Sequence, residues 1–209
     1  MFTVSTLKKS DAEFHHGNLE AALITAGLRH VEKHGLNSLG LRQLALVTGV
    51  SPTAVYRHFV DLEHLKASVA KASREVLGKM MVDALNSASS SKTAKGAKDR
   101  FLALGGAYID FGIKKSNLYE IAFICFDSPE LEPTSPSPWD LLMQSLVELK
   151  ELGCLPDKNF KIAPTIAWSM VHGFAGLAAQ GATGTVQQTA ASKNIVLQSV
   201  LKSLEIKLK

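Results

Sequence analysis

The segment 39–59, with the sequence LGLRQLALVTGVSPTAVYRHF, constrains the fold of this 209-residue chain more than any other stretch. Its first half carries apolar residues at helical spacing, and Gly49 then supplies the positive φ that a sharp turn needs. Ser51 stands as an N-cap residue with Pro52 in the first helical position, which starts a second helix. The segment therefore predicts two short helices joined by a tight turn.

The second of these helices has two chemically different faces. Val55 and Phe59 point to one side, while small, hydroxylated and basic residues lie on the other. The chain has no Asp or Glu between Lys33 and Val60, and carboxylates in such a position would repel DNA phosphates. The pattern fits a helix laid in the major groove of DNA. The alternative is an ordinary helical hairpin of an all-α protein.

The run GVSPTAVYRHF resembles the helix-turn-helix of the tetracycline-repressor (TetR) family of transcription regulators. The resemblance extends from about Gly17 to Leu65 and includes an apolar first-helix pattern that ends at Gly35. It implies a DNA-binding domain over residues 15–64, with the helix-turn-helix motif at about 40–59.

Two further motifs resemble one subset of this family. The W-x-x-x-H-G pattern at 168–173 is similar to its C-terminal WHG domain, and the HHG sequence at 15–17 is similar to the start of its first helix. Together these resemblances cover most of the chain. They imply that residues 65–209 form a ligand-sensing and dimerisation domain.

The resemblance also implies which side chains meet DNA. Tyr56 and His58 are expected to contact phosphates and so to position the helix. Arg42 is the best candidate for a bidentate contact to guanine. Leu62 stands where the family usually has a phosphate-binding Lys, and Lys66 is the candidate substitute. The residues expected near base edges are Arg42, Ser51, Pro52, Thr53, Ala54 and Arg57.

The sequence predicts an all-α fold with about nine helices: an N-terminal three-helix helix-turn-helix domain and a C-terminal helical effector and dimerisation domain. A long helix capped by Asp61 is expected to join them. Residues 87–96 have the composition of a flexible loop, and four prolines exclude regular structure over 127–138. One helix is expected from Asp157 or Asn159 to about Gln180, and the last one over roughly 186–208.

Aromatic and other polarizable side chains recur at helical spacing in the C-terminal part. We expect them to line an apolar effector pocket, in which His172 supplies one polar contact. The ordinary core of an all-α domain has the same spacing, and Trp168 with His172 fits a packed pair in such a core. The candidate pocket residues are Phe101, Tyr108, Phe111, Tyr119, Phe123, Phe126, Met143, Trp168 and His172.

The resemblance further implies a homodimer whose last two helices form a four-helix bundle with those of the partner. Small residues over 173–181 are compatible with close helix packing. A two-fold dimer presents two recognition helices, so its DNA operator should be a palindrome with half-sites about one helical turn apart, or a multiple of it.

Composition argues against several other classes of protein. The chain is 46% hydrophobic and 20% charged, which describes a globular protein, and its net charge of +4 permits DNA binding without requiring it. Two cysteines in unlike contexts fit a reducing cytoplasm, and the N-terminus has no signal-peptide pattern. We expect no metal, no cofactor and no catalytic site, because no ligand set or nucleophile context is visible.

Residues 162–192 carry no Lys, Arg, Asp or Glu, which approaches the pattern of a membrane-spanning helix. Pro164, His172 and Gln180 interrupt it, so a helix buried in a core and a subunit interface is the favoured interpretation.

The function expected from all of this is sequence-specific regulation of transcription. We expect a repressor that a small apolar effector releases from its operator. Three alternatives stay open at this stage: a DNA-binding regulator without a small-molecule effector, a small-molecule carrier or enzyme that retains the helix-turn-helix as scaffold, and an activator.

Overall fold

A computed structural model describes residues 19–126 and 133–207. Within these residues the fold is all-α, as predicted, with ten α-helices, one short 3-10 helix and no strand. The HHG sequence at 15–17 and the chain before it lie outside the described residues, as do 127–132 of the proline-rich segment.

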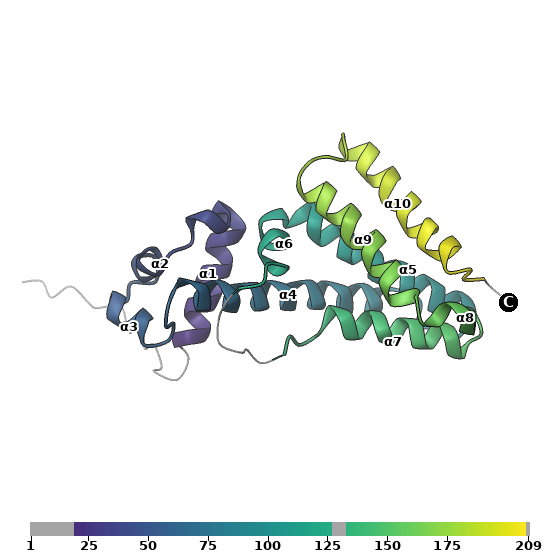
Figure 1. Ribbon diagram of the computed structural model, residues 1–209, viewed down its shortest axis with the longest axis horizontal. Helices are drawn as coiled ribbons and strands as arrows, with labels where there is room; N and C mark the ends of the chain where they lie inside the picture. The colour runs from purple at the N-terminus through teal and green to yellow at the C-terminus, as the bar shows by residue number, and fades with distance from the viewer. Residues whose placement is uncertain (1–18, 127–132, 208–209) are drawn as a thin grey trace, which may run out of the picture.

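The N-terminal helices form the left-hand end of the molecule in Figure 1. They are α1 (Leu19–His34), the 3-10 helix η1 (Leu36–Ser38), α2 (Leu41–Thr48) and α3 (Pro52–Tyr56). A buried apolar core joins them, with Leu23, Leu44 and Phe59 at 1% exposure or less.

The long helix α4 (Leu62–Ser87) runs from this end far into the rest of the molecule (Figure 1). The Asp61 carboxylate accepts the His64 backbone N–H at 2.8 Å, so the predicted cap is present. α4 packs on α1 and on three helices of the C-terminal part. Gly27 lets α1 approach closely, because a Cβ there would lie 2.9 Å from Val69 of α4. The predicted division after residue 64 therefore falls inside one continuous helix.

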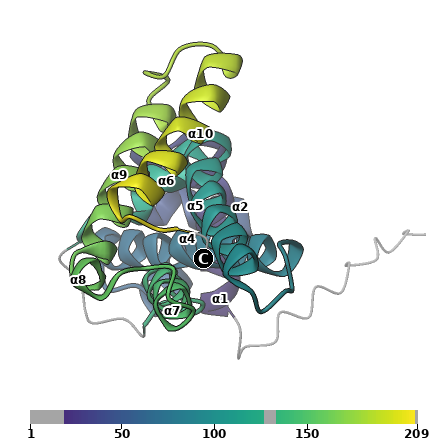
Figure 2. The same ribbon diagram turned by 90° about the vertical axis from the view of Figure 1, so that its right-hand side faces the viewer.

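Six helices complete the C-terminal part. α5 lies between α4 and α9, while α6 contacts α1, α4, α5 and α9. In Figures 1 and 2, α9 and α10 rise away from the α4–α7 layer. The helices are α5 (Ala94–Lys114), α6 (Ser116–Ala122), α7 (Pro138–Glu151), α8 (Asp157–Phe160), α9 (Ala163–Ala179) and α10 (Val186–Ser203).

Several boundaries differ from the sequence prediction. α7 begins at Pro138, the last residue of the segment expected to lack regular structure, because proline is well suited to the first turn of a helix. α5 begins at Ala94, inside the expected loop, because the Thr93 hydroxyl caps it by accepting the Gly96 N–H at 3.2 Å. The helix expected from 157 to 180 is divided into α8 and α9 just before Pro164, which lacks an N–H to continue the first helix. This division makes ten helices instead of about nine. α10 ends at Ser203, where the chain turns and Glu205 takes a positive φ.

The charge-free segment spans α9, the turn that follows it and the first part of α10. None of the helices in the described part of the chain is both long enough and apolar enough to cross a bilayer.

Candidate functional site

The helix-turn-helix is held by contacts that the sequence pattern anticipates. Gly49 ends α2 in the left-handed region, with φ 69° and ψ 22°. The Ser51 hydroxyl caps α3 by accepting the Ala54 N–H at 3.2 Å, and Pro52 follows in the first turn. Val55 and Phe59 are fully buried. These contacts fix which face of α3 turns outward.

The residues predicted to meet DNA lie mostly on this outward face. Ala54 and His58 are half-buried, and Tyr56 is 51% exposed. No acidic residue belongs to α2 or α3, which suits a surface that approaches phosphates. The exposed members of the predicted set are Arg42, Ser51, Pro52, Thr53, Tyr56 and Arg57.

Two of the basic side chains near this surface have acidic neighbours. His58 Nδ1 lies 3.6 Å from the carboxylate of Glu20 on α1. The Lys66 ammonium donates to Glu63 at 2.9 Å. A phosphate contact by either residue would therefore compete with a neighbouring carboxylate. The contact between His58 and Glu20 cannot be inferred from the sequence, because the two residues are far apart in the chain.

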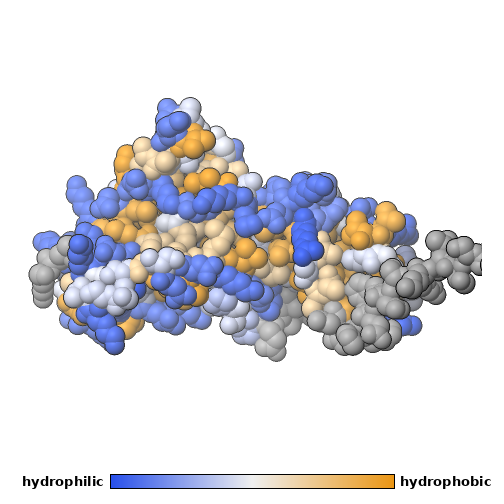
Figure 3. Space-filling model, turned by 180° about the vertical axis from the view of Figure 1, so that it is seen from behind, coloured by the Kyte–Doolittle hydropathy of each residue, from blue (hydrophilic) through white to orange (hydrophobic). Residues whose placement is uncertain are grey.

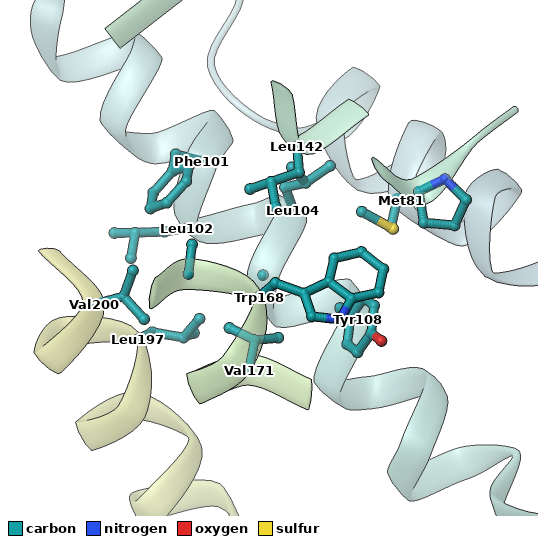
Figure 4. A pocket seen from close by; sticks show the side chains of 13 residues that line it. Met81, Phe101, Leu102, Leu104, Tyr108, Leu142, Trp168, Val171, Leu197 and Val200 are labelled. Atoms are coloured by element: carbon teal, nitrogen blue, oxygen red, sulfur yellow. The ribbon is translucent and has the colours of Figure 1, made fainter. Parts of the chain in front are cut away.

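A small, partly open cavity of about 40 Å³ lies between α4, α5, α7, α9 and α10. Figure 4 shows Trp168 and Tyr108 at one side of it, with Phe101 and several aliphatic side chains around the remainder. Three predicted pocket residues thus line a shared cavity. Its lining residues are Met81, Phe101, Leu102, Leu104, Gly105, Tyr108, Pro138, Leu142, Ala167, Trp168, Val171, Leu197 and Val200.

Beside this cavity, His172 is the centre of an aromatic cluster. Its Nδ1 lies 2.8 Å from the Tyr108 hydroxyl and 2.9 Å from the Tyr119 hydroxyl. The Tyr119 hydroxyl also donates to the His172 carbonyl at 2.8 Å. The rings of Trp168 and Phe123 pack against the imidazole, with centroids 6.1 Å and 4.8 Å away. His172 does not line the cavity and reaches it through Tyr108.

Burial shifts the ionisation of this cluster toward its neutral forms. It raises the pKa of Tyr119 to about 12 and raises the pKa of Tyr108 further. It lowers the pKa of His172 below its ordinary value. The cluster is therefore uncharged at neutral pH and serves as a hydrogen-bonded anchor for Tyr108.

The other predicted pocket residues are placed elsewhere. Phe111 is fully buried and packs on Tyr119, whereas Phe126 and Met143 are half-buried and do not line the cavity. Most of the lining was missed because it is aliphatic. A Leu or Val at helical spacing looks the same in sequence whether it faces a filled core or a cavity.

A second hollow is an open groove between α4, α5 and α10, on the face shown in Figure 3. A salt bridge between Lys193 and Asp110 lies along it. Because the groove is more open to solvent than the cavity, it offers a small molecule less burial.

α6 connects the aromatic cluster to the DNA-binding end. Tyr119 belongs to α6 and bonds His172, as described above. At the start of α6, the Asn117 side chain donates to the Glu32 carbonyl of α1 at 3.0 Å, and Lys115 forms a salt bridge with the Glu32 carboxylate. A displacement of α6 that moves Tyr119 would therefore also disturb the contacts with Glu32 at the end of α1.

Apolar and small residues are exposed along α9 and α10. Leu177 and Ile195 are 52% and 66% exposed. Gly173 lies in the middle of α9, and a Cβ added to it would meet nothing within 4 Å. Glycine inside a helix costs about 1 kcal/mol relative to alanine. Among the described residues, no neighbour comes close enough to require a glycine at this position. A close neighbour outside the chain would explain the glycine.

Comparisons with known proteins agree with this architecture. Residues 101–200 match the family described as "Tetracyclin repressor-like, C-terminal domain". An uncharacterized HTH-type transcriptional regulator of Bacillus subtilis (strain 168), YobS, is 25% identical over 190 residues, which cover 91% of this chain and 94% of the relative.

Solved structures with the same fold cover most of the chain. A protein of unknown function from Rhodococcus sp. RHA1 has a TM-score of 0.70 and 26% identity, covering 90% of this chain and 98% of its own. A TetR protein from Acinetobacter baumannii AYE, in complex with minocycline, has a TM-score of 0.63 and 18% identity, covering 88% and 95%.

Three findings agree. Residues 101–200 match a known C-terminal domain, a transcriptional regulator aligns over nearly the whole chain, and α3 exposes a polar face. This protein is a DNA-binding transcriptional regulator, and its residues 101–200 resemble the C-terminal domain of the tetracycline repressor.

Proposed function

We propose that the protein acts as a homodimeric repressor that binds a palindromic operator and is released from it by a small apolar effector. The observation that carries the proposal is the combination of an exposed polar face on α3 with a partly open apolar cavity in the C-terminal part. A cytoplasmic location follows from this role, since the operator lies there.

The DNA contacts proposed are those of the exposed α3 face and of Arg42. Tyr56 and His58 would hold phosphates, while Arg42, Thr53 and Arg57 would lie near base edges. The remaining members of the set, Ser51, Pro52 and Ala54, form the first turn of α3 and its cap.

The effector site proposed is the cavity lined by Phe101, Tyr108 and Trp168. His172 is assigned to orient Tyr108, because its Nδ1 lies within hydrogen-bond distance of the Tyr108 and Tyr119 hydroxyls. The Trp168–His172 pair and Gly173 support placement of the protein in the WHG subset of the family.

Release of DNA would require the effector to favour one dimer geometry over another. An effector can shift such an equilibrium only by its difference in affinity for the two states. The link from Tyr119 through α6 to Glu32 of α1 gives the cavity a physical connection to the DNA-binding end. A dimer in which the spacing of the two α3 helices no longer matches that of the major grooves would dissociate from the operator.

Selection of bound sequences from random duplex DNA, repeated with a metabolite extract, tests the proposal. The expected result is a palindrome whose half-sites lie about 34–36 Å apart or a multiple of this, with binding weakened by the extract. Enrichment of no sequence, or of a single unrepeated half-site, would contradict it.

The small volume of the cavity favours one competing function. A regulator with a filled C-terminal core would respond to a protein partner instead of a small molecule. In that case small apolar compounds would leave the melting temperature unchanged, since a ligand raises it only by binding the folded state.

A further inference from the structure

The residues around the cavity determine which chemical class of effector it accepts. Building on the effector site proposed above, we infer that the effector is an uncharged, largely hydrocarbon molecule about the size of one aromatic ring, and that carboxylates and ammonium ions are excluded.

The lining of the cavity offers no charged partner to a bound ion. None of the described residues that line the cavity is Asp, Glu, Lys, Arg or His. An ion placed there would lose its hydration and gain no counter-charge, which costs several kcal/mol or more. Tyr108 contributes its ring, and its hydroxyl is directed to His172.

Two charged residues that lie close to lining residues in the sequence of α5 are already paired. Arg100, next to Phe101, forms a salt bridge with Glu148 and donates to the Ser91 carbonyl at 2.9 Å. Asp110, half a turn beyond Tyr108, is bonded to Lys193 and Lys114. Using one of these groups to neutralise a bound ion would break an existing pair.

The volume of the cavity limits the size of the effector. A cavity of about 40 Å³ holds little more than ordered water. The lining includes two small residues, Gly105 and Ala167, together with the flexible side chain of Met81. A single ring would require Met81 and its neighbours to rotate, whereas a rigid multi-ring compound would require the helices to separate.

A matched series of one-ring probes tests the inference on the full chain. The probes are toluene, benzoate and benzylammonium, which differ mainly in charge. At several times its dissociation constant, toluene is expected to raise the melting temperature by about 2–4 °C. Benzoate and benzylammonium are expected to give no rise beyond that of sodium chloride at equal concentration.

Two variants locate the binding. Ala167→Leu fills the cavity and should abolish the toluene shift. Ala21→Leu makes the same change on the exposed face of α1 and should retain it. Trp139→Phe leaves Trp168 as the single tryptophan of the chain, so its fluorescence reports directly on the cavity and should change with toluene. This measurement does not depend on Ala167→Leu folding.

A shift with benzoate or benzylammonium as large as that with toluene would overturn the inference. It would also be overturned by no response to toluene, or by a toluene shift that survives in Ala167→Leu. The probe experiment does not depend on operator binding. A protein that binds toluene alone among the probes and fails to select DNA would therefore contradict the proposed function and leave the effector class standing.

Discussion

At the scale of single residues, Arg42 and Tyr56 are both exposed but are expected to make different contacts with DNA. Arg42→Ala should remove discrimination at one base position of each half-site, by about 1–3 kcal/mol, because a bidentate guanine contact is lost. Tyr56→Phe should instead weaken binding to all sequences alike, because phosphates carry no sequence information. Affinities for single-base variants of the selected operator separate the two effects. Unchanged base preference in Arg42→Ala would show that another side chain reads that base.

His172 gives a residue-scale prediction about pH. Burial lowers its pKa in the folded protein, so the unfolded chain binds the proton more readily between that lowered value and about 6.5. The unfolded state is then favoured as pH falls through this window, and stability is lost on acidification.

Melting temperatures of wild type and His172→Gln between pH 7 and pH 5 check this. The variant should lose less on acidification than wild type does. His34→Gln is the control, since it removes an exposed histidine by the same change. Identical pH dependence of wild type and His172→Gln would contradict the prediction.

At the scale of elements, α6 is held to α4 by neighbouring polar side chains. The buried Ser73 hydroxyl donates to the Leu118 carbonyl at 2.7 Å, and the Arg74 guanidinium donates to the Ala122 carbonyl at the end of α6 at 2.8 Å. Helix packing alone allows a short helix to slide, whereas these bonds fix its position along α4. They keep Tyr119 in register with His172.

Ser73→Ala should therefore lower the free energy of unfolding by about 1–2 kcal/mol, because a buried hydrogen bond between two helices is lost. Chemical denaturation measures this. Ser68→Ala is the matched control on the same helix, because the Ser68 hydroxyl only bonds the His64 carbonyl one turn earlier. Equal destabilisation by both substitutions would argue against a specific tie between α4 and α6.

At the scale of the whole molecule, the exposed small and apolar residues of α9 and α10 are expected to meet a second copy. Gly173→Leu should separate the dimer into monomers, because a side chain then projects where the partner helix must approach. The substitution itself favours helix formation, so loss of folding is not expected. Sedimentation equilibrium over a range of concentrations provides the measurement. Gly40→Leu, at another glycine with open space around its Cβ, is the control. A Gly173→Leu dimer as tight as wild type would exclude this interface.

The N-terminal half shows how much follows from local sequence alone. The turn at Gly49, the Ser51 cap with Pro52, and the Asp61 cap depend on residues within a few positions of each other. The outward face of α3 follows from them, since Val55 and Phe59 must be buried. Local backbone chemistry therefore determined the helix-turn-helix without reference to the rest of the chain.

The cavity and its polar anchor were decided only by the tertiary structure. Tyr108 and His172 are 64 positions apart, and only the packing of α5 against α9 brings them to 2.8 Å. The packing of helices also brings the Glu20 carboxylate of α1 close to His58. Periodicity gives the buried face of a helix but not its neighbour across that face. The aliphatic lining of the cavity was consequently indistinguishable from ordinary core until the helices were placed.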